Sequence, residues 1–384
     1  MESIARHAAP AARAGPPPRR RLRPGARTRA RCAGGGGEAM TYSRLCGAAV
    51  RRRQRAGFGA VLAAPGGEDG GVEDVGSGQG GTTPPLAATV ELHGPARVPI
   101  THTEAYSLHY VLAGHGTAVA CRGGLDADDQ APCDDPTLSP LQPGDSVLFP
   151  PGAAHVIRPD AEVGSIATLA IVLPAGAGGL TEAREYATGW AQKERVGELT
   201  EADVRLLLGI DADDDVDSQG DDEAGDDGAG GGTASGEAAL LKRGLAELVS
   251  FKPPNGDRNR IALVYDGSTQ ELPFTFALEI FQPGHRTPPH MHAKSHELFF
   301  ILKGDGEAYC EGSERVAVAP GDLVIMPPGR LHGIDAGAAE PLFCLELMLN
   351  DAHANFGEFV RSGEDVGGLQ DDDLCSLIHV GCAQ

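Results

Sequence analysis

Apolar residues along this chain occur mainly in short runs of strand length that are separated by turns. The pattern is clearest in two regions, each with an aromatic or β-branched run, a Gly-x-Gly turn, a second strand, a Pro-Gly-Asp turn, an apolar strand and a Pro-Pro-Gly turn. Short apolar runs bounded by Gly and Pro are typical of β-strands joined by tight turns. The pattern therefore predicts a mainly β protein.

The two regions are copies of one another. Residues 143–157 align with residues 320–334, an offset of 177, and nine of the fifteen positions are identical. Residues 108–118 align with residues 298–308 at an offset of 190, and the 13-residue difference falls in an acidic insertion. A repeat of this length indicates a duplicated domain rather than a solenoid, whose repeats reach about 50 residues at most.

Helical patterns occur between the copies and after them. A capping box at residues 200–203 precedes Val204–Leu208, with Gly209 as a stop, and Ala238–Val249 has apolar residues at helical spacing. Residues 211–237 contain 11 acidic residues and almost no hydrophobic ones, which predicts a disordered insertion. We therefore expect a helical connection over residues 176–250 and a helical C-terminal tail over residues 351–384.

Composition and charge narrow the possible partners. The 384 residues, 41% of them hydrophobic, are sufficient for two domains with a core each. Residues 1–56 contain 14 Arg, no Lys and two Glu, so they carry +12 of the net charge of -22 and the remainder carries -34. An acidic body repels nucleic acid, and no apolar run reaches the roughly 18 residues that span a bilayer. We expect neither a nucleic-acid nor a membrane partner.

The N-terminal region has the composition of a targeting segment. Residues 1–56 are rich in Arg, Ala and Pro and lack the apolar core of a secretory signal. We interpret them as a transit peptide, which implies an organellar location, a plastid more than a mitochondrion. A start at Met40 is the alternative and implies a cytoplasmic protein. Residues 57–84 are Gly-rich and are expected to be a flexible linker, and the eight cysteines, with no CxxC pair, are expected to be reduced.

Four residues of the second copy are candidate metal ligands. They are His290, His292, Glu297 and His332. Residues i and i+2 of a strand point to the same face, so both histidines of the His-x-His pair can point into a barrel. Three imidazoles and one carboxylate suit Fe(II), Mn(II), Ni(II), Zn(II) or Cu(II) and leave two positions open on an octahedral ion. The pattern predicts one divalent transition metal as cofactor.

The spacing of these residues resembles the two signature motifs of the cupin superfamily. The first runs from Gly284 through the ligands to Gly304 and the second from Gly321 to His332, with Ala336 where the family often has Asn. The resemblance covers about residues 86–172 and 253–350 and implies a bicupin, with two double-stranded β-helix (jelly-roll) barrels joined by short helices. We place the N-terminal barrel at residues 85–175 and the C-terminal barrel at residues 251–350.

The first copy departs from this pattern. At the four ligand positions it has Ile100, His102, Ser107 and His155. Only two of the four ligands are retained, so we predict a degenerate metal site, unless His109 or Glu104 substitutes.

Three further residues are candidate substrate contacts. Phe299 and Ile301 share the strand phase of Glu297 and would form an apolar wall, and Arg330 would bind a substrate carboxylate or lie in solvent.

The ligand set favours a metal-dependent enzyme acting on a small organic molecule, in the first place an Fe(II) dioxygenase. The alternatives are an Mn or Zn lyase, decarboxylase or isomerase, and a non-enzymatic small-molecule-binding or storage-like bicupin. Catalytic character and homo-oligomer formation stay open.

Overall fold

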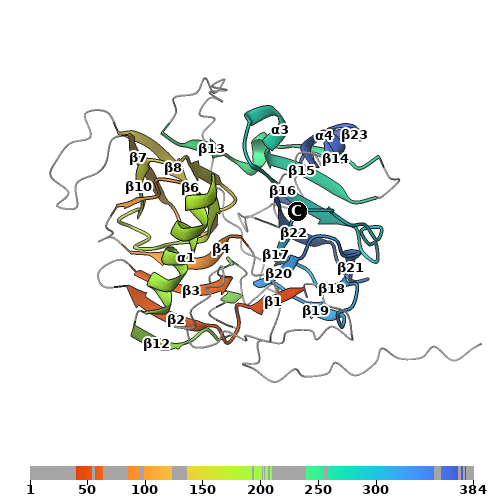
Figure 1. Ribbon diagram of the computed structural model, residues 1–384, viewed down its shortest axis with the longest axis horizontal. Coiled ribbons are helices and arrows are strands. Elements are labelled where there is room, and N and C mark those ends of the chain that lie inside the picture. The colour runs from red at the N-terminus through yellow and green to blue at the C-terminus, as the bar shows by residue number, and fades with distance from the viewer. Residues whose placement is uncertain are drawn as a thin grey trace, which may run out of the picture.

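Two β-barrels lie side by side in the computed structural model (Figure 1). The structure describes residues 40–370, except for residues 54–56, 64–84, 95–98, 123–135, 193, 201, 203, 206–207, 210–238, 255–257 and 350–355, and it also describes residues 373, 374 and 377. The predicted mainly β architecture of two barrels is confirmed. Within the described residues, no helix is long and apolar enough to span a membrane.

The N-terminal barrel combines an eight-stranded and a four-stranded antiparallel sheet. The larger sheet has the order β12 (Glu194–Glu198), β2 (Ala49–Arg53), β3 (Gly57–Ala63), β4 (Ala87–His93), β11 (Ile166–Pro174), β6 (Ala105–Ala113), β9 (Ser146–Phe149) and β13 (Leu241–Arg243). The smaller sheet has the order β5 (Ile100–Thr101), β10 (Ala153–Pro159), β7 (Gly116–Arg122) and β8 (Thr137–Leu141). Helix α1 (Ala177–Ala191) packs against this barrel through Ala183 and Ala187.

The C-terminal barrel repeats this arrangement. Its eight-stranded sheet has the order β1 (Thr41–Arg44), β20 (Asp322–Met326), β17 (Glu297–Lys303), β22 (Leu342–Leu349), β16 (Phe274–Phe281), β15 (Arg260–Tyr265), β14 (Val249–Lys252) and β23 (Glu364–Gly368). Its smaller sheet has the order β19 (Val316–Val318), β18 (Gly306–Cys310) and β21 (His332–Ala336). Short helices are α3 (Gly267–Gln270), α4 (Phe356–Arg361) and the 3-10 turn η1 (Leu245–Glu247).

Each barrel completes one sheet edge with a strand from outside its own copy. Strand β1, from the N-terminal end, pairs with β20 of the C-terminal barrel, as Figure 1 shows. Strand β13, which precedes the C-terminal barrel, pairs with β9 of the N-terminal barrel. Because β9 and β20 are equivalent strands of the repeat, the two additions are reciprocal and cover equivalent edges, which would otherwise expose unpaired backbone groups.

Polar contacts stabilise the position of β1 beside β20. The Asp322 carboxylate, 1% exposed, accepts hydrogen bonds from the Tyr42 hydroxyl at 2.9 Å and from the Arg44 guanidinium at 3.1 Å. A shared apolar core then joins the barrels and contains Tyr110 and Leu169 of one barrel and Phe300 and Leu345 of the other. The two barrels therefore pack as one structural unit.

Two predicted boundaries at the N-terminal end are wrong. Residues 41–53, expected within the transit peptide of residues 1–56, contain β1 and β2, and the first part of the expected linker, residues 57–84, forms β3. The Arg-rich and Gly-rich composition hid these strands because they are short, yet their backbones pair within the sheets and a few apolar side chains, among them Tyr42 and Leu62, reach the cores. Residues 1–39, 64–84 and the acidic insertion 211–237 lie outside the described residues.

The connection and the tail also differ from the predictions. The helix expected at Ala238–Val249 is wrong, because long-range pairing draws Leu241–Arg243 into β13 and places Leu245 and Leu248 in the shared core. The helix before Gly209 is supported by hydrogen bonds from the Val204 amide to the Thr200 carbonyl and from the Leu208 amide to the Val204 carbonyl, both 3.0 Å, and Gly209 has a left-handed φ of 68°.

The tail of residues 351–384 contains a strand, β23, as well as helix α4. The prediction of reduced thiols throughout also needs correction, because Cys121 is disulfide-bonded. Among the described cysteines, Cys46, Cys310 and Cys344 are not disulfide-bonded.

Candidate metal centre

The four predicted ligands converge at one end of the C-terminal barrel. Glu297 and His332 are the first residues of β17 and β21, whereas His290 and His292 lie in the extended segment between β16 and β17. The expected regular strand at residues 290–292 is reduced to a single bridge between His290 and His332. Backbone bonds fix this segment, from the His332 amide to the His290 carbonyl at 2.9 Å and from the Gly329 amide to the His292 carbonyl at 2.7 Å.

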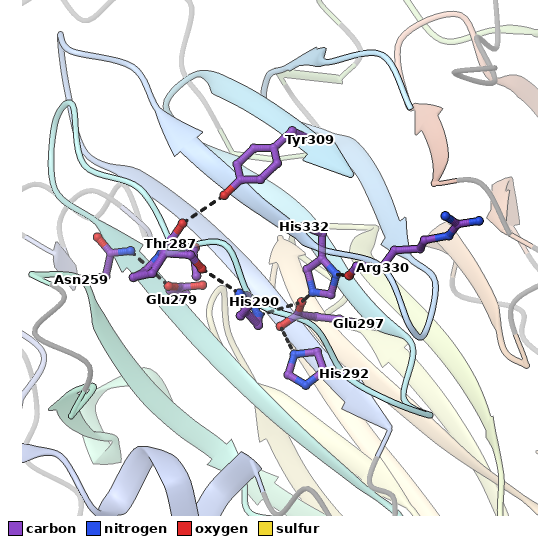
Figure 2. A network of polar contacts seen from close by, with 10 residues as sticks. Asn259, Glu279, Thr287, His290, His292, Glu297, Tyr309, Arg330 and His332 are labelled. Carbon is purple, nitrogen blue, oxygen red and sulfur yellow. Dashed lines mark hydrogen bonds and ion pairs between the residues drawn. The ribbon is translucent and has the colours of Figure 1, made fainter. Parts of the chain in front are cut away.

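The Glu297 carboxylate lies at the centre of the group (Figure 2). Its oxygens are 2.7 Å from His332 Nε2, 3.6 Å from His290 Nε2 and 3.7 Å from His292 Nε2. One ligand atom from each of the four residues lies within 4.8 Å of all the others. This spacing brings three nitrogens and one oxygen around one point, as a single ion requires.

Backbone carbonyls orient two of the imidazoles. The Nδ1 atom of His332 lies 2.7 Å from the Arg330 carbonyl, and the Nδ1 atom of His290 lies 3.0 Å from the Pro288 carbonyl. A carbonyl accepts a hydrogen bond, so each Nδ1 carries the proton and each Nε2 faces the centre, the arrangement common among metal-binding histidines. The Nε2 atom of His292 is buried and has no hydrogen-bond partner within the described residues. The donor set therefore fits one divalent metal ion.

The charges of the group interact strongly. Burial raises the pKa of Glu297, but the close contacts with the three histidines outweigh it and hold the pKa well below its usual range. Burial lowers the pKa of His290, but the contact with Glu297 dominates and raises that pKa to about 9. Without metal, the site thus contains an imidazolium–carboxylate pair whose proton competes with a metal ion.

We expect metal affinity to rise with pH until the pH passes the raised pKa of His290. Metal binding must displace the His290 proton, so the apparent affinity should fall by about tenfold for each pH unit below about 9. Calorimetric titration of the metal-free protein with Mn(II) between about pH 6.5 and 8.5 checks this. An affinity that does not change across that interval would contradict the raised pKa.

The three predicted substrate contacts have different outcomes. Phe299 and Ile301 are buried, at 1% and 0% exposure, in the apolar interior of the C-terminal barrel, as their phase predicts. The side chain of Arg330 points away from the histidines and Glu297 in Figure 2, so its predicted contact with a substrate at the metal has no support. Arg330 contributes to the site only through its backbone carbonyl oxygen, which accepts a hydrogen bond from His332 Nδ1.

Sequence reasoning missed two acidic residues. Glu279 of β16 and Glu346 of β22 are 3% and 2% exposed inside the same barrel. The sequence did contain a signal for them. Each is the only charged residue of its strand, and the other residues of these strands are apolar except for one threonine in β16. A buried carboxylate in such a strand needs a partner or a function.

The equivalent position in the N-terminal barrel has a different polar network. The rings of His102 and His155 are 6.1 Å apart, and Ser107, in place of the Glu297 carboxylate, contacts His109 Nε2 at 3.0 Å. His109 continues through the Thr168 hydroxyl at 3.2 Å to His93, whose Nε2 lies 2.7 Å from that hydroxyl. These histidines do not meet around one point, and Glu104, on the barrel rim, is exposed.

Comparisons with known proteins agree with this architecture. Residues 277–348 match the family model of the cupin domain. No curated protein matches the chain. Two solved structures of oxalate decarboxylase, from studies of its reaction specificity and of its proton-coupled electron transfer, are 16% and 15% identical to the chain, each with a TM-score of 0.50. In both cases 91% of this chain and 86% of that chain are covered.

A third structure is that of the Bacillus subtilis oxalate decarboxylase, a protein with Mn(II) centres. It is 16% identical, has a TM-score of 0.49 and covers the same shares of the two chains. At these identities the solved structures establish the fold. The C-terminal barrel therefore matches the cupin-domain model over residues 277–348, and the chain as a whole has the bicupin fold of these structures.

Proposed function

We propose that the protein is a metal-dependent enzyme that acts on a small organic acid through Lewis-acid chemistry, in the lyase or decarboxylase class. The observation that carries this proposal is the graded exposure of the four ligands. The side chains of Glu297 and His332 are 2% and 0% exposed, whereas those of His292 and His290 are 15% and 31% exposed. The buried ligands Glu297 and His332 would hold an ion from the barrel interior, and a substrate would reach the ion from the side of the more exposed His290 and His292.

Four residues would hold the metal, and two apolar residues would shape its surroundings. His290, His292, Glu297 and His332 would hold the ion, which supplies a positive charge that polarises a bound carboxylate. Phe299 and Ile301 line the interior beside the site and keep bulk water from it, which strengthens electrostatic interactions there. The oxalate decarboxylases, which have the same fold, act on a small carboxylic acid, and this supports the class of substrate.

An Fe(II) dioxygenase is the second candidate. The apolar wall of Phe299 and Ile301 favours it, because an apolar environment accommodates molecular oxygen beside a metal. The donor set is compatible with iron as well as with manganese. The solved structures of similar fold favour the first candidate.

Product analysis separates the candidates. Protein loaded with Mn(II), Fe(II) or Zn(II) is incubated with a panel of small carboxylic acids while oxygen consumption and carbon dioxide release are followed. Carbon dioxide release without net oxygen uptake, lost in Glu297→Ala, supports the Lewis-acid class. Stoichiometric oxygen uptake with iron alone contradicts it in favour of a dioxygenase. Binding without turnover under any metal would identify a small-molecule-binding protein.

A further inference from the structure

The C-terminal barrel buries two carboxylates beyond the metal ligand. Glu279 and Glu346 are 3% and 2% exposed, and neither belongs to the four-residue ligand group. The rest of the interior around them is apolar and includes Phe281, Phe299 and Met326. Burying a carboxylate in such surroundings is unfavourable unless it receives hydrogen bonds, so these two residues call for an explanation that metal binding does not supply.

Both carboxylates are next to the metal site. Glu346 of β22 lies opposite Phe299 of β17, two residues along that strand from Glu297, and Glu279 of the next strand, β16, lies opposite Cys344 of β22. Figure 2 shows Glu279 grouped with Asn259 and Thr287 on one side of His290, with Glu297 and His292 on the other. The two extra carboxylates therefore border the space that a metal-bound molecule would occupy.

Hydrogen-bonding capacity remains unused in this group. Asn259 Nδ2 donates to Glu279 Oε1 at 3.3 Å. The Oε2 atom of Glu346 is buried and has no hydrogen-bond partner within the described residues, and the same holds for the Thr287 hydroxyl. A buried acceptor without a donor is costly, and a ligand that brings hydroxyl groups into this space would satisfy it.

We propose that Glu279 and Glu346 accept hydrogen bonds from hydroxyl groups of the substrate, which is a hydroxylated carboxylic acid rather than an unsubstituted one such as oxalate. This assignment rests on the proposed function, because it takes the metal-bound acid as the substrate. It separates this chain in chemistry from the oxalate decarboxylases that share its fold.

Propionate, lactate and glycerate test the assignment because they have the same three-carbon skeleton with zero, one and two hydroxyl groups. Their dissociation constants are measured by calorimetry on Mn(II)-loaded protein. The hydroxyl on the second carbon can chelate the metal, so the lactate-to-glycerate ratio isolates the second hydroxyl. We expect glycerate to bind about tenfold more tightly than lactate, which is the upper end of what one net hydrogen bond contributes.

Variants then identify the acceptors. Glu279→Gln and Glu346→Gln should reduce the preference for glycerate over lactate. The exposed carboxylate of Glu340 in the same barrel provides the matched control, and Glu340→Gln should leave that preference unchanged. Metal content and thermal stability are measured for each variant, so that lost folding is distinguished from lost recognition.

The outcomes distinguish the two proposals. Equal affinities for lactate and glycerate, or an unchanged ratio in both variants, would overturn the hydroxyl-recognition assignment even if turnover of an acid occurs. A preference that disappears in the variants, without turnover of any acid, would support the subsite and contradict the proposed function. If no acid binds to the loaded protein, both proposals fail.

Discussion

Replacement of Glu297 by alanine is expected to lower metal affinity by at least about 100-fold, because partners outside the ligand shell already contribute 10- to 100-fold. Glu297 is the only carboxylate in the four-residue group, and all three histidines contact it. Its loss removes a ligand and leaves the charge of the ion uncompensated. Metal analysis of purified protein, with close to one ion per chain in the unmodified form, measures the effect.

His102→Ala is the matched control for that substitution. His102 occupies the position in the N-terminal barrel that corresponds to His292, but its ring is 6.1 Å from that of His155 and it contacts Tyr186 of α1 instead. We expect this variant to retain its metal, whereas His292→Ala should lose it. An equal loss in His102→Ala would show that the first barrel also binds metal.

Phe300→Ala is expected to lower the free energy of unfolding by about 3–5 kcal/mol, the usual range for truncating a buried phenylalanine. Phe300 is fully buried in the core that both barrels share, on the face of β17 opposite to Phe299. The cavity would therefore weaken the packing between the barrels while leaving the ligand-bearing face in place. Urea denaturation, followed by fluorescence and circular dichroism, measures the change.

Leu138→Ala provides the control, because Leu138 is 62% exposed and its truncation should change stability by less than about 0.5 kcal/mol. The shared core also predicts one unfolding transition for both barrels. Two separate transitions, of which only one responds to Phe300→Ala, would show that the barrels unfold independently and that the shared core contributes little.

The four metal ligands could be predicted from the sequence because their spacing along the chain identifies them. His290, His292 and Glu297 lie within eight residues, and the internal repeat identifies the strand that carries His332. The two-residue period of a strand likewise placed Phe299 and Ile301 on the inward face with Glu297. Spacing along the chain sets which side chains share a face, and this does not depend on the remainder of the fold.

Other features depended on which distant segments meet. The apolar spacing of residues 238–249 suits a helix, yet Leu241–Arg243 pairs with β9 because that edge needs a partner. The apolar strands containing Glu279 and Glu346 indicate burial, but only the strand pairing of the barrel places them on strands β16 and β22 next to the strand that carries Glu297. Similarly, Tyr42 and Asp322 are 280 positions apart, and the pairing of β1 with β20 brings them together. Local patterns carry no information about such pairings, because their stability comes from tertiary contacts between segments that have no fixed separation in sequence.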